Sequence, residues 1–169
     1  GRRIGDASFD HGAQFMTTRD PRFAATVQDW VAAGVAEEWY SSFPGSSEKG
    51  HPRYRGVPTM TAIAKNLATD LNILRSVRVL DIAQHDNQWL ANLDNDQQVI
   101  AKSMIITSPV PQTMDLLASG NIKLSAANQA RLERIEYEAC IAVMAVLDGP
   151  SSIPVPGAIA LEDSPIAWI

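Results

Sequence analysis

The sequence of 169 residues has little cysteine, no block of basic residues and no long apolar run. Its single cysteine, Cys140, excludes an internal disulfide and favours a reducing compartment such as the cytoplasm. The net charge of -5 and the scattered basic residues make nucleic acid and anionic membranes unexpected partners. No apolar run approaches the roughly 20 residues of a membrane span, and no signal-peptide core opens the sequence. These absences predict a soluble cytoplasmic protein.

Recognisable catalytic motifs are also missing. The three histidines, His11, His51 and His85, lack the spaced partners of a zinc site, so we expect no metal. The sequence contains no G-x-S-x-G elbow, no Walker loop and no G-x-G-x-x-G. Cys140 lies in an apolar run without a neighbouring base, which predicts a buried, unreactive side chain. Motifs alone therefore assign no catalytic residue.

The most unusual stretch is Ser8–Pro21, which is interpreted as a strand that bends sharply before a helix begins. Gly12 and Ala13 are small residues at positions where a strand normally has large side chains. Small residues inside a strand indicate close packing of another strand or of a flat ligand against the backbone.

Four helices are predicted. The first has Asp20 as its cap, Pro21 in the first helical position and Gly34 as its terminator. Apolar residues spaced by three and four indicate a second helix that starts near Thr59 and includes Leu71. The remaining two are expected at about 111–118 and 125–135.

The predicted strands change in character along the chain. From Asn72 the pattern predicts a three-stranded meander that ends in Met104–Thr107, a continuous apolar run typical of a strand buried on both faces. The strands expected are Val35–Phe43, Arg53–Arg55, Ile73–Ile82, Gln88–Leu93, Val99–Thr107, Tyr137–Leu147 and a hairpin of Ala158–Leu161 with Ile166–Ile169 around the turn 162–165. An exposed loop is expected from Pro44 to Gly50.

The predicted fold class is α+β. We expect a mixed or antiparallel sheet with flanking helices near 20–34, 59–71 and 125–135, and the meander as a separate small sheet.

Several short segments, taken together and in order, resemble one family. They are Phe9–Phe15, Arg19–Phe23, Tyr54–Met60, Arg78–Ile82 with Trp89, Ile105–Gln112 and Asp163–Trp168. In this order they resemble the renalase-like FAD-dependent oxidoreductases of the flavin amine oxidase superfamily. The resemblance implies that 1–72 and 113–169 form two parts of a substrate domain. It implies that 73–112 supplies the meander and return strand of the FAD-binding domain.

The same resemblance implies that part of the enzyme is missing here. The family begins with a Rossmann unit whose glycine loop holds the FAD pyrophosphate, and this sequence has no such loop. We therefore expect an excised fragment whose partner is the Rossmann domain of the same polypeptide. We expect the fragment alone to be inactive and to bind FAD poorly.

Site residues follow from the resemblance alone. It implies cofactor contacts at Gly12, Ala13 and Gln14 beside the flavin ring and at Val79 beside the adenine. It also implies contacts at Thr107 and Pro109 along the return strand, with Gln112 nearby. It implies substrate contacts at His11, Gln14, Arg53 and Tyr54. Structural roles are the alternatives: a β-bulge at Gly12, a core valine at Val79, capping at the return strand, and an exposed edge strand at Arg53 and Tyr54.

The implied reaction is hydride transfer from a small-molecule substrate, an amine or a reduced nicotinamide-type compound, to the flavin, which oxygen then reoxidises. Since the cofactor carries this chemistry, the absence of a catalytic motif agrees with the resemblance. Two other functions stay open. One is a non-catalytic α+β module that binds a partner through the 44–52 loop or a sheet edge. The other is a related flavoprotein that acts as a desaturase or isomerase.

Overall fold

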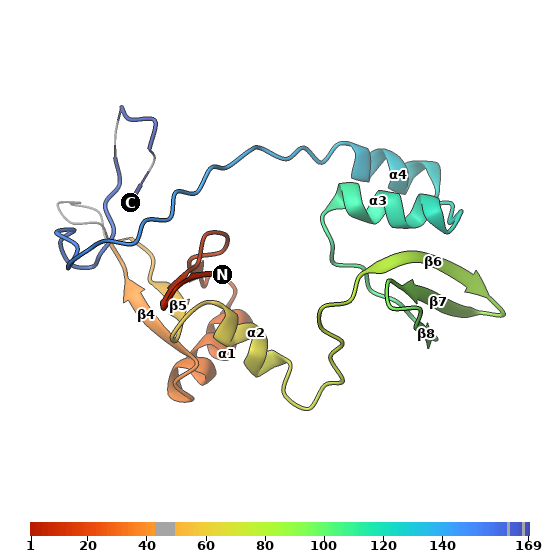
Figure 1. The fold of residues 1–169 in the computed structure, drawn as a ribbon, viewed down its shortest axis with the longest axis horizontal. Helices are drawn as coiled ribbons and strands as arrows, with labels where there is room; N and C mark the ends of the chain where they lie inside the picture. The colour runs from red at the N-terminus through yellow and green to blue at the C-terminus, as the bar shows by residue number, and fades with distance from the viewer. Residues whose placement is uncertain (43–49, 162, 167) are drawn as a thin grey trace. The chain divides into compact units, whose positions relative to one another are not determined.

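The structure, a computed structural model, describes residues 1–42, 50–161, 163–166 and 168–169 (Figure 1). In these residues it has an α+β fold with four helices and three antiparallel sheets, which confirms the predicted fold class. Contacts divide the chain into two units, Gly1–Asn72 with Ile141–Ile169, and Ile73–Cys140. The substrate-domain and FAD-domain labels of 1–72, 73–112 and 113–169 stay predictions.

The first unit contains two small sheets. Strands β1 (Arg2–Ile4) and β2 (Ala7–Phe9) form a hairpin. Strands β3 (Met16–Thr17), β5 (Arg53–Gly56) and β4 (Ala36–Tyr40) form a second sheet in the order β3-β5-β4. Because β5 is the central strand, the edge-strand interpretation of Arg53 and Tyr54 is wrong.

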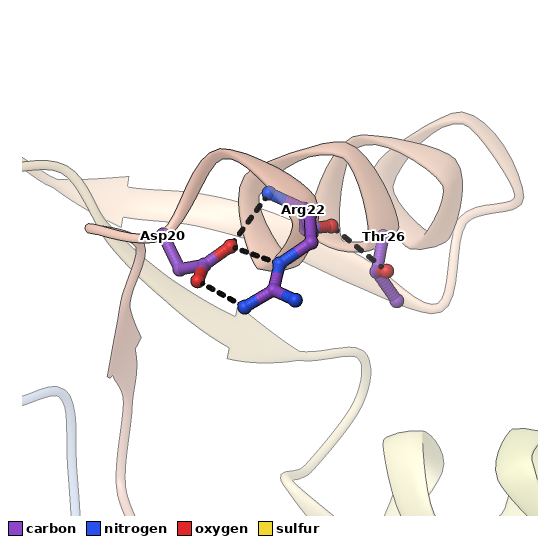
Figure 2. Close-up of polar contacts among 3 residues, drawn as sticks. All are labelled: Asp20, Arg22 and Thr26. Atoms are coloured by element: carbon purple, nitrogen blue, oxygen red, sulfur yellow. Dashed lines mark hydrogen bonds and ion pairs between the residues drawn. The ribbon is translucent and has the colours of Figure 1, made fainter.

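Helix α1 (Pro21–Ala32) begins and ends where its capping residues predicted. The Asp20 carboxylate accepts the backbone N–H of Arg22 at 2.8 Å, and its second oxygen accepts from the Arg22 guanidinium (Figure 2). Gly34 follows the helix with a φ of +70°, a conformation that glycine adopts without strain. The helix packs against β4 and buries Val27 completely.

Helix α2 (Thr61–Leu67) is shorter than the range predicted. It packs against β5 and buries Ile63, whereas Leu67 and Leu71 are exposed. The helix ends before Asp70, whose φ of 62° lies outside the helical region.

The second unit holds the meander of β6 (Val79–His85), β7 (Gln88–Leu93) and β8 (Gln98–Ala101). Strand β7 has the predicted bounds, and the turn before it places both Asp86 and Asn87 at positive φ. Helices α3 (Val110–Ser119) and α4 (Ala126–Glu133) complete the unit. Its core is Ile82, Ala91 and Leu117, from β6, β7 and α3.

Two strand predictions are wrong. Met104–Thr107 and Tyr137–Leu147 form no strand, although both are described. An apolar run becomes a strand only when another strand takes its backbone hydrogen bonds, and the described residues provide none for these segments. All the described strand pairs are antiparallel, which agrees with the antiparallel form of the predicted sheet.

Burial and packing correct two further expectations. Cys140 is exposed, because the apolar run that follows it is not covered: Ile141 is 91% exposed. Helix α4, expected to flank the substrate-domain sheet, lies in the second unit with the meander.

The C-terminal hairpin is reduced to one bridge between Ala160 and Trp168. Phe43, most of the 44–50 loop and Glu162 lie outside the described residues.

Candidate functional site

The second unit contains a cavity of about 960 Å³. Its walls come from the beginning of β6, from residues 104–108 and from one face of α3, with Ala91 of β7. The volume lies at the upper end of the range of pockets that hold a small organic ligand or part of a cofactor.

Most of the cavity wall is apolar. Val79 and Ile82 come from β6, and Met104 and Ile106 come from the extended segment that follows β8. Met104 and Ile106 are half-buried against the core, whereas Ile105 between them is 89% exposed. The segment therefore alternates its side chains as a strand would, although it pairs with no described strand.

One face of α3 supplies polar groups to the same cavity. Gln112, Asp115, Leu116 and Ser119 recur at intervals of three, one and three, which places them on one side of a helix. The first turn of α3 is held firmly, since the Thr113 hydroxyl contacts the carbonyl and the hydroxyl of Ser108, each at 2.9 Å.

The Tyr137 hydroxyl caps the N-terminal end of α3. It accepts the backbone N–H of Val110 at 2.8 Å, a donor that has no partner within the helix. Pro109 precedes the helix as its N-cap residue. These contacts hold the N-terminal end of α3 in place.

The cavity also holds one cationic and one anionic residue on different walls, Arg78 before β6 and Asp115 on α3. The Asp115 carboxylate and the Gln112 amide have no hydrogen-bond or ion-pair partner among the described residues. Both side chains are therefore available to a ligand.

The cavity brings together residues that the resemblance assigned to the cofactor. Val79, Thr107 and Gln112 all line it, although they come from β6, the extended segment and α3. Pro109 is not part of the lining, but it connects Thr107 to the polar helix. Whether these residues bind a cofactor stays a prediction.

The second predicted group, His11, Gly12, Ala13 and Gln14, lies in the first unit between β2 and β3. These residues belong to no strand, so the strand and β-bulge interpretations of Gly12 are wrong. A Cβ added to Gly12 would meet no atom within 4 Å, which leaves the backbone open to a flat group. His11 and Ala13 are also exposed, and Gln14 is half-buried.

Asp10 anchors this segment from its N-terminal side. Its carboxylate accepts the backbone N–H of Met60 at 2.8 Å, at the start of α2. The bond fixes the segment between β2 and β3 against the residues that open the helix.

Arg53 and Tyr54, the predicted substrate residues, make extensive contacts within the first unit. The Arg53 guanidinium lies over the rings of Phe15 and Tyr40, at 5.3 Å and 4.9 Å from their centroids. Tyr54 is 8% exposed, and its hydroxyl accepts from the Gln28 amide at 3.2 Å. Burial raises the pKa of the Tyr40 phenol, and the charge of Arg53 partly offsets this effect.

An aromatic group beside Arg53 connects distant parts of the first unit. Trp168 lies 6.4 Å from Phe15 and 6.2 Å from Trp39 between ring centroids. The Trp39 indole also donates to the carbonyl of Pro156 at 2.8 Å. These contacts make Trp168 a packing residue of the first unit.

Arg78, Asp115 and Ser119 also line the cavity, although the sequence did not predict them as site residues. The helical spacing of Gln112, Asp115 and Ser119 was available in the sequence as a polar stripe. What the spacing did not show was that this stripe faces an apolar cavity.

No family model matches the chain. Among the described residues, no cluster of three or more histidine, cysteine or acidic side chains is suited to holding a metal ion. None of the described helices has the length and apolar character needed to cross a membrane.

Proposed function

We propose that the chain is the substrate-binding portion of a renalase-like FAD-dependent oxidoreductase of the flavin amine oxidase superfamily. The observation that carries this proposal is the shared cavity of Val79 and Thr107. The resemblance assigns both residues to the cofactor, and they lie far apart in the sequence.

The residues present suit FAD in three respects. The cavity combines apolar walls with a few polar groups, as nucleotide-binding pockets do. Val79 opens β6, an edge strand of the meander, so main-chain groups on its unpaired side are accessible to a base. In the first unit, the open backbone at Gly12 permits the close approach of a flat ring.

When bound, the flavin supplies hydride acceptance and reaction with oxygen. The residues of this chain would bind and orient the flavin and the substrate. Gln14 can donate or accept a hydrogen bond beside the substrate, an amine or a reduced nicotinamide-type compound. The other partner in this proposal is a Rossmann domain of the same cytoplasmic polypeptide.

The test is to express the complete reading frame that encodes this chain and to measure its visible flavin absorbance after purification. We expect bound FAD, bleaching by an amine or reduced nicotinamide-type compound without oxygen, and hydrogen peroxide when air is admitted. A complete polypeptide without a G-x-G-x-x-G strand-turn-helix and without flavin would overturn the proposal. Bleaching without reaction with oxygen would instead favour a desaturase or isomerase.

The alternative is a non-catalytic α+β binding module. The observation that favours it is the extended segment Met104–Thr107, whose backbone has no strand partner among the described residues. Such a segment can accept a strand from another protein. Bound flavin in the complete polypeptide would exclude this alternative.

A further inference from the structure

Asp115, on the polar face of α3, has no role in the function proposed so far. Asp115 and Gln112 lie one turn apart on this face, and they line the same cavity as apolar residues of β6 and of the 104–106 segment. A flat heterocycle placed against those apolar residues would turn its polar edge toward α3.

The two side chains differ in what they can bond. An ionised carboxylate only accepts hydrogen bonds, whereas a side-chain amide both donates and accepts. An amino-substituted heterocycle presents a matching edge, since its exocyclic amine donates and the neighbouring ring nitrogen accepts. Carboxylates and amides select amino-bearing bases in this way in other settings.

We propose that Asp115 is a specificity residue that selects a 6-aminopurine, with Gln112 bonding the same edge of the base. This inference rests on the proposed function, because it places the adenine end of the dinucleotide in the second-unit cavity. The carboxylate accepts from the exocyclic amine. A 6-oxopurine presents a carbonyl oxygen at that position, which the carboxylate repels.

The contrast between adenosine and inosine isolates this contact, because the two nucleosides differ at position 6 and its neighbouring ring nitrogen. The whole chain of 169 residues, labelled with ¹⁵N, is titrated with each nucleoside while amide shifts of β6, residues 104–108 and α3 are followed. We expect adenosine to bind about tenfold more tightly than inosine, the size of effect that one charge-assisted hydrogen bond gives.

Asp115→Asn is the deciding variant. It keeps the shape of the side chain and removes the charge, so we expect the preference for adenosine to fall to about twofold or less. Because Asp115 is exposed, the variant should fold normally, which its amide spectrum will show. The matched control is Asp29→Asn on α1 of the first unit, which should leave the preference unchanged.

Equal binding of the two nucleosides, no binding of either, or an unchanged preference in Asp115→Asn would each overturn the inference. None of these outcomes decides the proposed function, since flavin in the complete polypeptide is measured separately. If the complete polypeptide binds flavin but Asp115 gives no preference for adenosine, only the role assigned to the α3 face is overturned.

Discussion

Gly120 and Ile82 are in such close contact that a side chain at position 120 would overlap the Ile82 carbonyl oxygen. Gly120 is the C-cap residue of α3, and Ile82 is the most deeply buried residue of β6. The contact sets how closely the helix approaches the meander, and thereby one dimension of the cavity between them.

Gly120→Ala should therefore destabilise the second unit. We expect a loss of about 1–3 kcal/mol, the usual cost of overpacking, because backbone on both sides must shift. Denaturant unfolding measures the change, and faster hydrogen exchange in β6–β8 locates it. Gly12→Ala is the control, since a Cβ there meets open space, and an equal effect of both variants would contradict the expectation.

Asp20 should stabilise α1 in a pH-dependent way. The Arg22 guanidinium, more than any other group, lowers the pKa of Asp20 below its usual value of 3.8. A lowered pKa in the folded state gives stability that is present above the usual value and is lost as pH falls through the folded value.

The comparison of wild type with Asp20→Ser and Asp20→Ala separates this charge effect from capping. Serine keeps an acceptor for the helix N-terminus but cannot pair with Arg22, whereas alanine loses both contacts. In melting experiments, the advantage of wild type over Asp20→Ser should shrink as pH falls below 3.8. A constant difference across that range would rule out the ionic contribution.

Tyr40 should titrate at a higher pH than an ordinary tyrosine. Burial raises the pKa of its phenol above the usual 10.0, and Arg53 only partly opposes this. The associated stability is complete below the usual value and is lost as pH rises through the folded value. In an ultraviolet titration of phenol ionisation, Tyr40→Phe should remove the component that titrates at the highest pH. Tyr137→Phe, at a 57% exposed position, should keep this component.

Arg53 should contribute to the stability of the first unit, whatever its role in substrate binding. Its guanidinium lies over two aromatic rings, and a lysine ammonium cannot stack in the same way. We expect Arg53→Lys to cost about 1 kcal/mol in denaturant unfolding. Arg134→Lys at an exposed position is the control; unchanged stability of Arg53→Lys would leave substrate binding as the better explanation of this residue.

The 169-residue chain alone should not bind FAD tightly. Its sequence has no glycine-rich loop at a helix N-terminus to hold the pyrophosphate. Flavin fluorescence should stay unperturbed when the chain is added, with the complete polypeptide as the comparison. Tight stoichiometric binding by the chain would contradict this prediction.

Local signals predicted much of the fold. The cap at Asp20 and the glycine at position 34 bounded α1, and β7 has the bounds that the sequence predicted for it. Each of these signals depends on residues close in sequence, whose contacts are made within one element. The open conformation of Gly12 was not predictable in this way, since glycine fits both a strand and an irregular segment.

The sequence by itself determined the α+β composition and the limits of α1. Only the tertiary structure decided that Met104–Thr107 lacks a strand partner, that β5 is a central strand, and that Val79, Thr107 and Asp115 line one cavity. Propensity and capping act over a few residues, whereas strand pairing and cavity formation depend on which distant segments meet.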